Sequence, residues 1–85
     1  MLTFETYTTR VVDLLGLDLS DRPITPDDGL YTDLALDSFQ ALQLIVVTEA
    51  IADISVPPVE IPELFSAQDA YDYYVSLRNR TDDAR

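Results

Sequence analysis

Apolar side chains recur every three or four positions near the start of the chain: Phe4, Tyr7, Val11 and then Leu14 or Leu15. Residues spaced in this way lie on one face of an α-helix. Thr3 can cap the start of such a helix and Gly16 can end it. The pattern therefore predicts an amphipathic helix over residues 3–16 with its apolar face toward the core.

A second helical pattern covers residues 38–52, but its apolar side chains go nearly all the way round the helix. They are Phe39, Ala41, Leu42, Leu44, Ile45, Val46, Val47 and Ile51. A surface helix normally has a single apolar stripe. This helix is therefore either buried in the centre of the domain or presents part of its surface to a partner. Asp37 suits the N-cap, and Gln40 three positions later completes a capping-box pattern.

Residues 17–36 are expected to form a long loop between these helices, because Pro23 and Pro26 interrupt any regular element. The sequence from Thr25 to Asp28 is typical of one short turn. Loops of this length in compact domains usually serve a function. Four apolar residues are expected to hold the loop against the core: Leu30, Tyr31, Leu34 and Leu36.

A third long helix is expected after a second break in the pattern. Residues 53–61 contain a Pro-Pro pair, which excludes a continuous helix, and Pro62 can open a short helical turn. Ser66 and Asp69 then form the pattern of another capping box. The last helix is expected to run to about Leu77, with one apolar face made of Ala67, Ala70, Tyr71, Tyr74 and Leu77.

No part of the sequence alternates with a period of two for long enough to predict a strand. The elements together predict an all-α fold. It is a small four-helix bundle with three main helices, one short helix and a long loop between the first and second helices. Residues 1–77 are expected to form the single domain, and residues 78–85 a flexible C-terminal tail.

The chain of 85 residues is strongly acidic, with a formal net charge of −11. This charge argues against nucleic acids and membranes as partners. It serves either solubility or attraction to basic partner surfaces. The N-terminal sequence lacks the pattern of a signal peptide, and no apolar run approaches the ~20 residues of a membrane span. We therefore expect a cytoplasmic protein, and a monomer.

Ser38, at the predicted start of the second helix, is the candidate for chemistry. A serine nucleophile needs a base, usually His or Lys, but the sequence has no His, Cys or Lys. We therefore expect that the protein is not an enzyme and holds no metal centre. Three interpretations of Ser38 stay open: an ordinary helix-start residue, a kinase target, or the anchor for a group that another enzyme attaches covalently.

Several motifs resemble those of the acyl and peptidyl carrier protein family, and the resemblance covers nearly the whole chain in the expected order. The family has an Asp-Ser step after an apolar residue at the start of its second helix. It also has a weaker signature at the start of its last helix. The motifs in this chain are Leu36-Asp37-Ser38-Phe39, Val56-Pro57 and, further on, Ser66, Asp69, Ala70 and Tyr73 or Tyr74.

The resemblance implies that Ser38 carries 4′-phosphopantetheine, which a phosphopantetheinyl transferase takes from coenzyme A with magnesium. The terminal thiol of this cofactor would hold an acyl, aminoacyl or peptidyl group as a thioester. The resemblance also implies partners with basic docking surfaces: a loading enzyme, an acyltransferase or a ketosynthase. The residues expected to contact partners are Asp37, Phe39, Gln40, Gln43, Val46 and Glu49, with Glu60 and Glu63 supplying further charge.

The sequence departs from the family pattern at three positions that bear on the pathway. Phe39 replaces the usual aliphatic residue, and Gln40 and Gln43 stand where carriers of fatty acid synthesis tend to have acids. These departures favour a discrete carrier in a polyketide or nonribosomal peptide pathway, as in antibiotic and other secondary metabolism. The alternatives are a carrier of primary fatty acid synthesis and an acidic helical interaction module whose Ser38 is unmodified.

Overall fold

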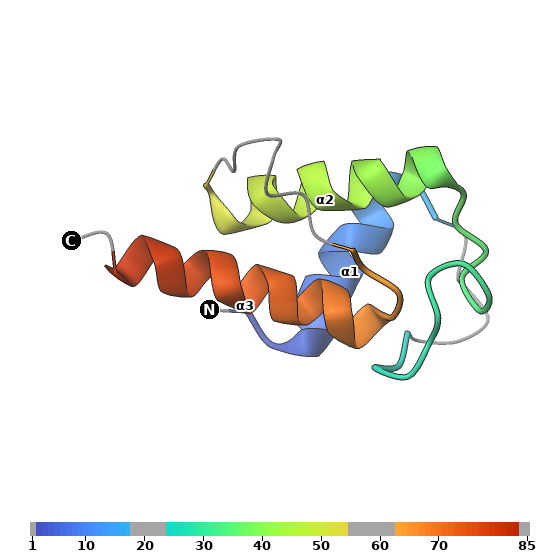
Figure 1. The fold of residues 1–85 in the computed structure, drawn as a ribbon, viewed down its shortest axis with the longest axis horizontal. Coiled ribbons are helices and arrows are strands. Elements are labelled where there is room, and N and C mark those ends of the chain that lie inside the picture. The colour runs from blue at the N-terminus through green and yellow to red at the C-terminus, as the bar shows by residue number, and fades with distance from the viewer. Residues whose placement is uncertain (1, 18–23, 55–62, 84–85) are drawn as a thin grey trace.

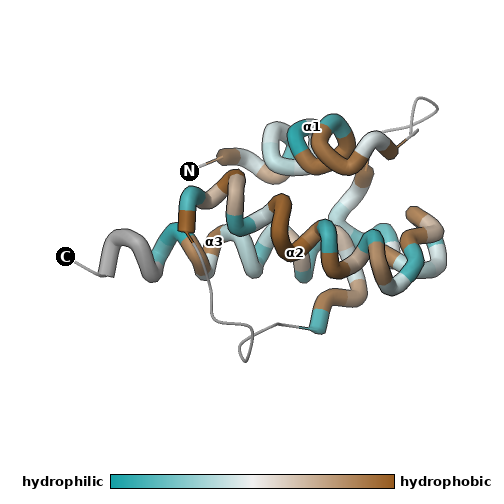
Figure 2. Tube along the Cα trace, turned by 90° about the horizontal axis from the view of Figure 1, so that it is seen from above, coloured by the Kyte–Doolittle hydropathy of each residue, from teal (hydrophilic) through white to brown (hydrophobic). Residues whose placement is uncertain are grey.

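The computed structural model describes residues 2–17, 24–54 and 63–83. The described residues form three α-helices: α1 (Phe4–Leu15), α2 (Ser38–Ala52) and α3 (Ala67–Asp83). In Figure 1, α2 and α3 run side by side, and Figure 2 shows α1 lying along one side of that pair. Each helix contacts the other two. The described ranges contain no β-strand, only an isolated bridge between Gly29 and Ser66.

This arrangement confirms the all-α class and the three main helices of the predicted bundle. The short fourth helix was expected to open at Pro62, which lies outside the described residues. Residues 63–65, which follow it, are not helical. The Pro-Pro pair that was expected to separate the second and third main helices also lies outside the described ranges.

The start and end of α1 follow the sequence prediction. The Thr3 hydroxyl accepts a hydrogen bond from the Thr6 backbone N–H at 3.2 Å. At the other end, Gly16 adopts a left-handed conformation with φ 70°, and its N–H bonds to the Val12 carbonyl. A residue with a side chain would be strained in this conformation, so glycine suits the position.

Reciprocal capping boxes begin both α2 and α3, as predicted. The Asp37 carboxylate accepts from the Gln40 N–H at 2.8 Å, and the Gln40 side-chain oxygen accepts from the Asp37 N–H at 3.1 Å. At α3, the Ser66 hydroxyl accepts from the Asp69 N–H at 3.1 Å and the Asp69 carboxylate accepts from the Ser66 N–H at 3.2 Å. These bonds satisfy backbone donors that a helix start otherwise leaves unpaired.

The last helix is longer than predicted, because α3 continues six residues past Leu77 to Asp83. The prediction ended the helix where the apolar residues stop. No Gly or Pro follows Leu77, however, so nothing in the sequence breaks the helix there. The Arg78 guanidinium also donates to the Ala52 carbonyl at 3.1 Å, which ties this part of α3 to the end of α2. The flexibility of residues 78–85 stays a prediction.

The core lies where the three helices meet. Of the two adjacent leucines at the end of α1, Leu15 packs against the core and Leu14 is 59% exposed. The predicted apolar face of α3 is confirmed, with Tyr71 partly buried and the other members buried. The buried cluster consists of Tyr7, Val11, Leu30, Leu36, Leu44, Ile45, Ala52, Leu64, Ala70, Tyr74 and Leu77.

The described part of the long loop, residues 24–36, is fastened to the start of α3. The Leu30 N–H donates to the Phe65 carbonyl at 2.8 Å, and the Ala67 N–H donates to the Asp28 carbonyl at 2.8 Å. The predicted turn at residues 25–28 is confirmed by a bond of 3.1 Å from the Asp28 N–H to the Thr25 carbonyl. These bonds fix the position of the loop relative to α3 before the chain enters α2.

The prediction that four apolar loop residues face the core is right for three of them, because Leu34 packs against the buried cluster that contains Leu30 and Leu36. Leu30 and Leu36 are buried and Leu34 is partly buried, whereas Tyr31 is 46% exposed. The backbone N–H of Leu30 also bonds to the Phe65 carbonyl, which holds this part of the loop against the start of α3. In this turn the side chain of the next residue, Tyr31, faces outward.

Tyr7 on α1 makes a buried hydrogen bond with Thr48 on α2, with 2.7 Å between the hydroxyl oxygens. Burial raises the pKa of Tyr7 from 10.0 to about 12, and the bond to Thr48 opposes only part of that rise. The folded protein therefore holds this proton at pH values where the unfolded chain releases it. Tyr7 is 1% exposed, so solvent weakens this effect little.

We expect the free energy of unfolding to fall as the pH rises from about 10 to about 12, with a loss of roughly 2–3 kcal/mol attributable to Tyr7. Below pH 10 this contribution is fully present, since both states keep the proton. Urea unfolding curves at about pH 9 and about pH 11.5 measure it. Tyr7→Phe should lose less stability over the same interval, and an equal loss in both proteins would contradict the assignment.

Candidate functional site

Ser38 is the first residue of α2, and its side chain is exposed. The capping box at Asp37 and Gln40 fixes the backbone on which it sits. The Ser38 hydroxyl makes no hydrogen bond with any residue that the structure describes. It is therefore an accessible hydroxyl at a rigid position, at the end of the loop that connects to α2.

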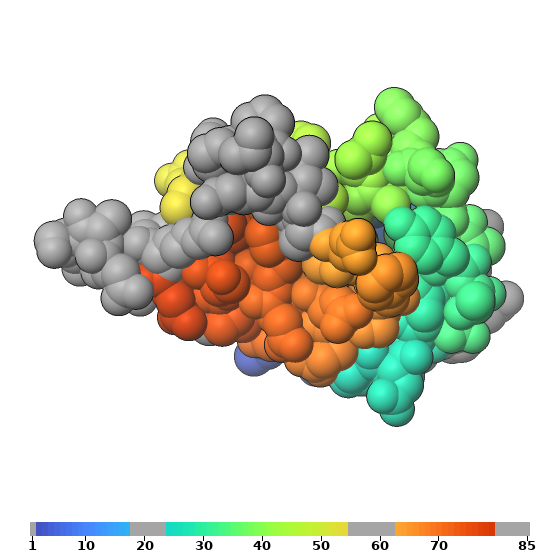
Figure 3. Space-filling view, viewed as in Figure 1, coloured from blue at the N-terminus to red at the C-terminus, as the bar shows by residue number. Residues whose placement is uncertain are grey.

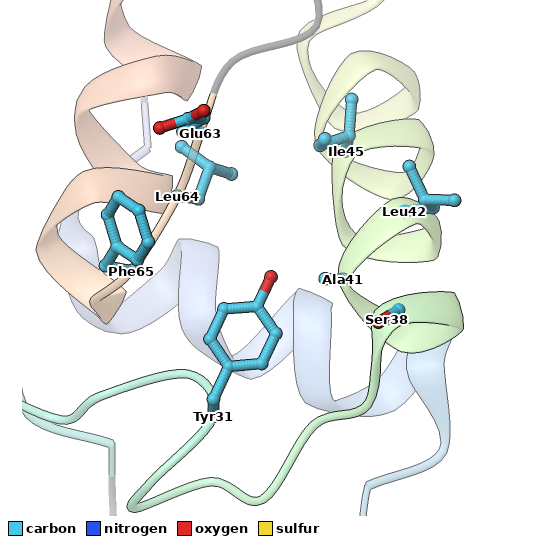
Figure 4. A pocket seen from close by; sticks show the side chains of 8 residues that line it. All are labelled: Tyr31, Ser38, Ala41, Leu42, Ile45, Glu63, Leu64 and Phe65. Carbon is cyan, nitrogen blue, oxygen red and sulfur yellow. The ribbon is translucent and has the colours of Figure 1, made fainter.

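A groove with a volume of about 420 Å³ opens beside Ser38 (Figure 4). Three segments form it: α2, the loop and the residues just before α3. In Figure 3 the loop, the start of α2 and the start of α3 meet on the same face of the molecule. The groove is lined mainly by apolar side chains. Its residues are Tyr31 from the loop, Ser38, Ala41, Leu42 and Ile45 from α2, and Glu63, Leu64 and Phe65.

Among the described residues that line the groove there is no His or Lys, the usual bases for a serine nucleophile. Its one acidic residue is Glu63, which lies across the groove from α2 in Figure 4. The Asp37 carboxylate is occupied as the cap of α2. Within the described ranges, no group of three His, Cys, Asp or Glu side chains could hold a metal ion.

The N-terminus of α2 favours a negatively charged group on Ser38. Backbone N–H groups and the helix dipole make a helix start partly positive, and phosphate groups bind there readily. Asp37 adds an opposing charge next to the serine, although its carboxylate is partly compensated by the Gln40 N–H. A phosphate group on Ser38 would therefore meet both the positive end of the helix and the negative charge of Asp37.

A second surface of α2 carries three of the residues that were expected to contact partners. Phe39 and Val46 are 67% and 64% exposed, and Gln43 is exposed between them. They border a hollow of about 290 Å³ between α1 and α2. Its lining consists of Leu14, Leu15, Phe39, Leu42, Gln43, Val46 and Val47. We call this set the α1–α2 apolar patch.

The family model for the phosphopantetheine attachment site matches residues 8–73. The chain belongs to this family of carrier proteins. It is similar to an acyl carrier protein of Syntrophobacter fumaroxidans, with 26% identity over 66 residues, 75% of this chain and 82% of that protein. It is also similar to a mitochondrial acyl carrier protein of Saccharomyces cerevisiae. That match has 28% identity over 81 residues, 88% of this chain and 65% of the yeast protein, which is less than two thirds of its length.

Membership of the carrier family means that the protein has a covalently attached 4′-phosphopantetheine. The residues around Ser38 fit this group. The hydroxyl is exposed, the helix start accepts a phosphate, and the adjacent groove has room and an apolar lining for the flexible arm. When bound, the cofactor supplies a thiol that forms thioesters. The residues of the carrier protein itself supply the anchor and the surface around it.

The other predicted partner residues are not gathered at one surface of the carrier protein. Gln40 is partly buried and belongs to the capping box, while Glu49 accepts a bond from the Tyr73 hydroxyl at 3.5 Å. Glu63 lines the Ser38 groove and not the α1–α2 apolar patch. Glu60 lies outside the described residues. No helix in the described ranges is long and apolar enough to cross a membrane.

Four exposed residues at these two surfaces were not predicted as site residues: Leu14, Leu42, Tyr31 and Phe65. A signal existed for Leu14, because only one of two adjacent leucines can face the core. The all-round apolar pattern of α2 gave a similar signal for Leu42. Nothing in the sequence distinguishes Tyr31 and Phe65, which reach the groove through the folding of irregular segments.

Proposed function

We propose that the protein carries acyl, aminoacyl or peptidyl intermediates as thioesters on a 4′-phosphopantetheine attached to Ser38. It delivers them to partner enzymes and does not catalyse their conversion. The observation that best supports this proposal is the exposed Ser38 hydroxyl at the start of α2, beside an open apolar groove. The competing proposal is a helical interaction module whose Ser38 is never modified.

Intact-protein mass spectrometry distinguishes these two proposals. The protein is incubated with coenzyme A, magnesium and a phosphopantetheinyl transferase of broad specificity, and fragment spectra then locate any added group. We expect a mass gain of one phosphopantetheine on Ser38. No gain with several transferases, on protein shown to be folded, would favour the interaction module.

We also propose that the carrier serves a polyketide or nonribosomal peptide pathway. The support is the character of α2, whose exposed residues include Phe39, Gln43 and Val46 and whose first turn contains no acid. Both curated relatives are named acyl carrier proteins, without a pathway of this kind. Efficient use of the protein by the fatty acid synthesis enzymes of its host would overturn the proposal. The cytoplasmic location also stays a prediction, and one relative is mitochondrial.

The α1–α2 apolar patch is the surface that we propose for docking of partner enzymes. Its exposed members Phe39, Leu42 and Val46 would bury apolar area against an apolar partner surface. Glu49 and Asp53 line the hollow next to Val46, and the whole chain carries a net charge of −11. A basic rim on the partner enzyme complements this charge and speeds association.

Phe39→Ala and Val46→Ala should each lower the kcat/KM of a partner enzyme for the carrier by roughly tenfold or more, as truncation of a central apolar contact does at other interfaces. Loading assays with the phosphopantetheinyl transferase measure this effect. Thr9→Ala is the control, because Thr9 is exposed on α1 and lies outside the patch. If all three variants load at the same rate as the original protein, the patch is not the docking surface for that enzyme.

A further inference from the structure

We propose that Tyr31 is a positioning residue for the cofactor arm. Its hydroxyl hydrogen-bonds an amide group of 4′-phosphopantetheine and holds the arm in the groove beside Ser38. This inference rests on the proposed attachment at Ser38 and adds a residue that neither the motifs nor the capping residues identify.

The first observation is the way in which Tyr31 is held. Its neighbour Leu30 is buried, and the backbone N–H of Leu30 donates to the Phe65 carbonyl at 2.8 Å. Asp33 and Leu34, on the other side, each donate a backbone hydrogen bond of 3.0 Å to the Gly29 carbonyl. The backbone on both sides therefore fixes Tyr31. Its side chain contributes little to this anchoring, since it is 46% exposed.

The second observation is the direction of the Tyr31 hydroxyl. In Figure 4 the ring rises from the loop, and its oxygen points into the space between α2 and residues 63–65. This oxygen makes no hydrogen bond with any described residue of the chain. A tyrosine hydroxyl that enters an apolar site normally pairs with a partner. Because Tyr31 is 46% exposed, its hydroxyl is open to a partner that enters the groove.

The chemistry of the groove identifies that partner. Ala41, Leu42, Ile45, Leu64 and Phe65 give it apolar walls. The arm has amide groups, which lose free energy when they leave water without a hydrogen bond. Apart from Ser38 itself, Tyr31 and Glu63 are the lining residues with polar side chains within the described part of the chain. A few polar groups in an apolar site are what orient a bound molecule.

Exposed aromatic area gives a further reason for the arm to occupy this place. Tyr31 is 46% exposed and Phe65 is 61% exposed, and both line the same groove. Covering these rings with the methyl and methylene groups of the arm removes apolar surface from water, which favours the docked state. The ring of Tyr31 thus provides apolar contact with the arm, and its hydroxyl orients the arm in the groove.

Nuclear magnetic resonance of the holo-protein tests the role of Tyr31. The arm is attached by the transferase, and its paired methyl groups are compared with those of free phosphopantetheine. We expect shifted methyl signals and cross-relaxation between these methyls and the Tyr31 ring. Tyr31→Phe keeps the ring but loses the hydroxyl, so the ratio of docked to undocked arm should fall roughly three- to tenfold, the effect of one hydrogen bond.

Two further variants make the test specific. Tyr31→Ala should abolish both the shift and the cross-relaxation, since it removes the ring as well. Tyr73→Phe makes the same chemical change at a partly buried tyrosine outside the groove, and should leave the docked ratio unchanged. Backbone spectra of all variants establish that they are folded.

The outcomes separate this inference from the proposed function. If the original protein gains no phosphopantetheine on Ser38, the proposed function fails. If it gains the group but the arm methyls match free phosphopantetheine, only the inference about Tyr31 is overturned. The same holds if Tyr31→Phe docks the arm as well as the original protein does.

Discussion

Ser38→Ala should abolish the attachment of phosphopantetheine and leave the fold intact. The substitution removes the only atom on this residue that can form the phosphodiester. It keeps the Asp37 cap of α2, and Ser38 makes no hydrogen bond with a described residue that could be lost. The change in the free energy of unfolding should therefore stay within about 0.5 kcal/mol, as is usual for surface substitutions. Intact mass and thermal unfolding measure the two effects.

The matched control is Ser76→Ala, which changes an exposed serine on α3. This variant should gain one phosphopantetheine as fully as the original protein. A mass gain that survives in Ser38→Ala would show that another residue is the anchor. A large loss of stability in that variant would instead show that Ser38 has a structural role, which would weaken the carrier proposal.

The helix starts could be predicted from the sequence because they depend on local interactions. Asp37 and Gln40, like Ser66 and Asp69, lie three residues apart, and the same bonds form at almost any helix start with these side chains. Ser38 could be selected for the same reason. The cap places Ser38 at the first position of α2, and the packing around the helix leaves it exposed.

The two surfaces of α2 could not be assigned from the sequence. An apolar pattern that goes all round a helix does not indicate which face is buried. Figure 2 shows apolar residues along much of α2. The packing of α1 and α3 against α2 determines which face of α2 is buried. It buries Leu44 and Ile45 and leaves Phe39 and Val46 exposed. The proposal that part of α2 docks a partner fits this arrangement better than full burial does.

Irregular segments account for the differences in the loop and in the lining of the groove. Neither Leu30 and Tyr31 in the loop nor the residues before α3 repeat with a regular period, so the sequence does not say which side chain turns inward. The packing of segments distant in sequence decides it, and the backbone bond from Leu30 to Phe65 is one contact that holds such segments together. The groove beside Ser38 is built from such segments on one side, and for this reason its lining could not be predicted.

Leu77→Ala should lower the free energy of unfolding by roughly 3–5 kcal/mol, because Leu77 is fully buried and the helices around it can only partly fill the space. Stability for a chain of this size is on the order of 5–10 kcal/mol. The substitution would therefore remove a large part of it.

The control for Leu77 is Leu14→Ala, which makes the same chemical change at a leucine that is 59% exposed. It should cost less than about 1 kcal/mol, since little apolar area returns to water. Urea unfolding of both variants measures the difference. An equal loss in the free energy of unfolding in the two variants would show that Leu77 is not buried between the helices. The expected difference would also establish that Leu14 contributes little to folding, which leaves its exposed side chain available to a partner enzyme at the α1–α2 apolar patch.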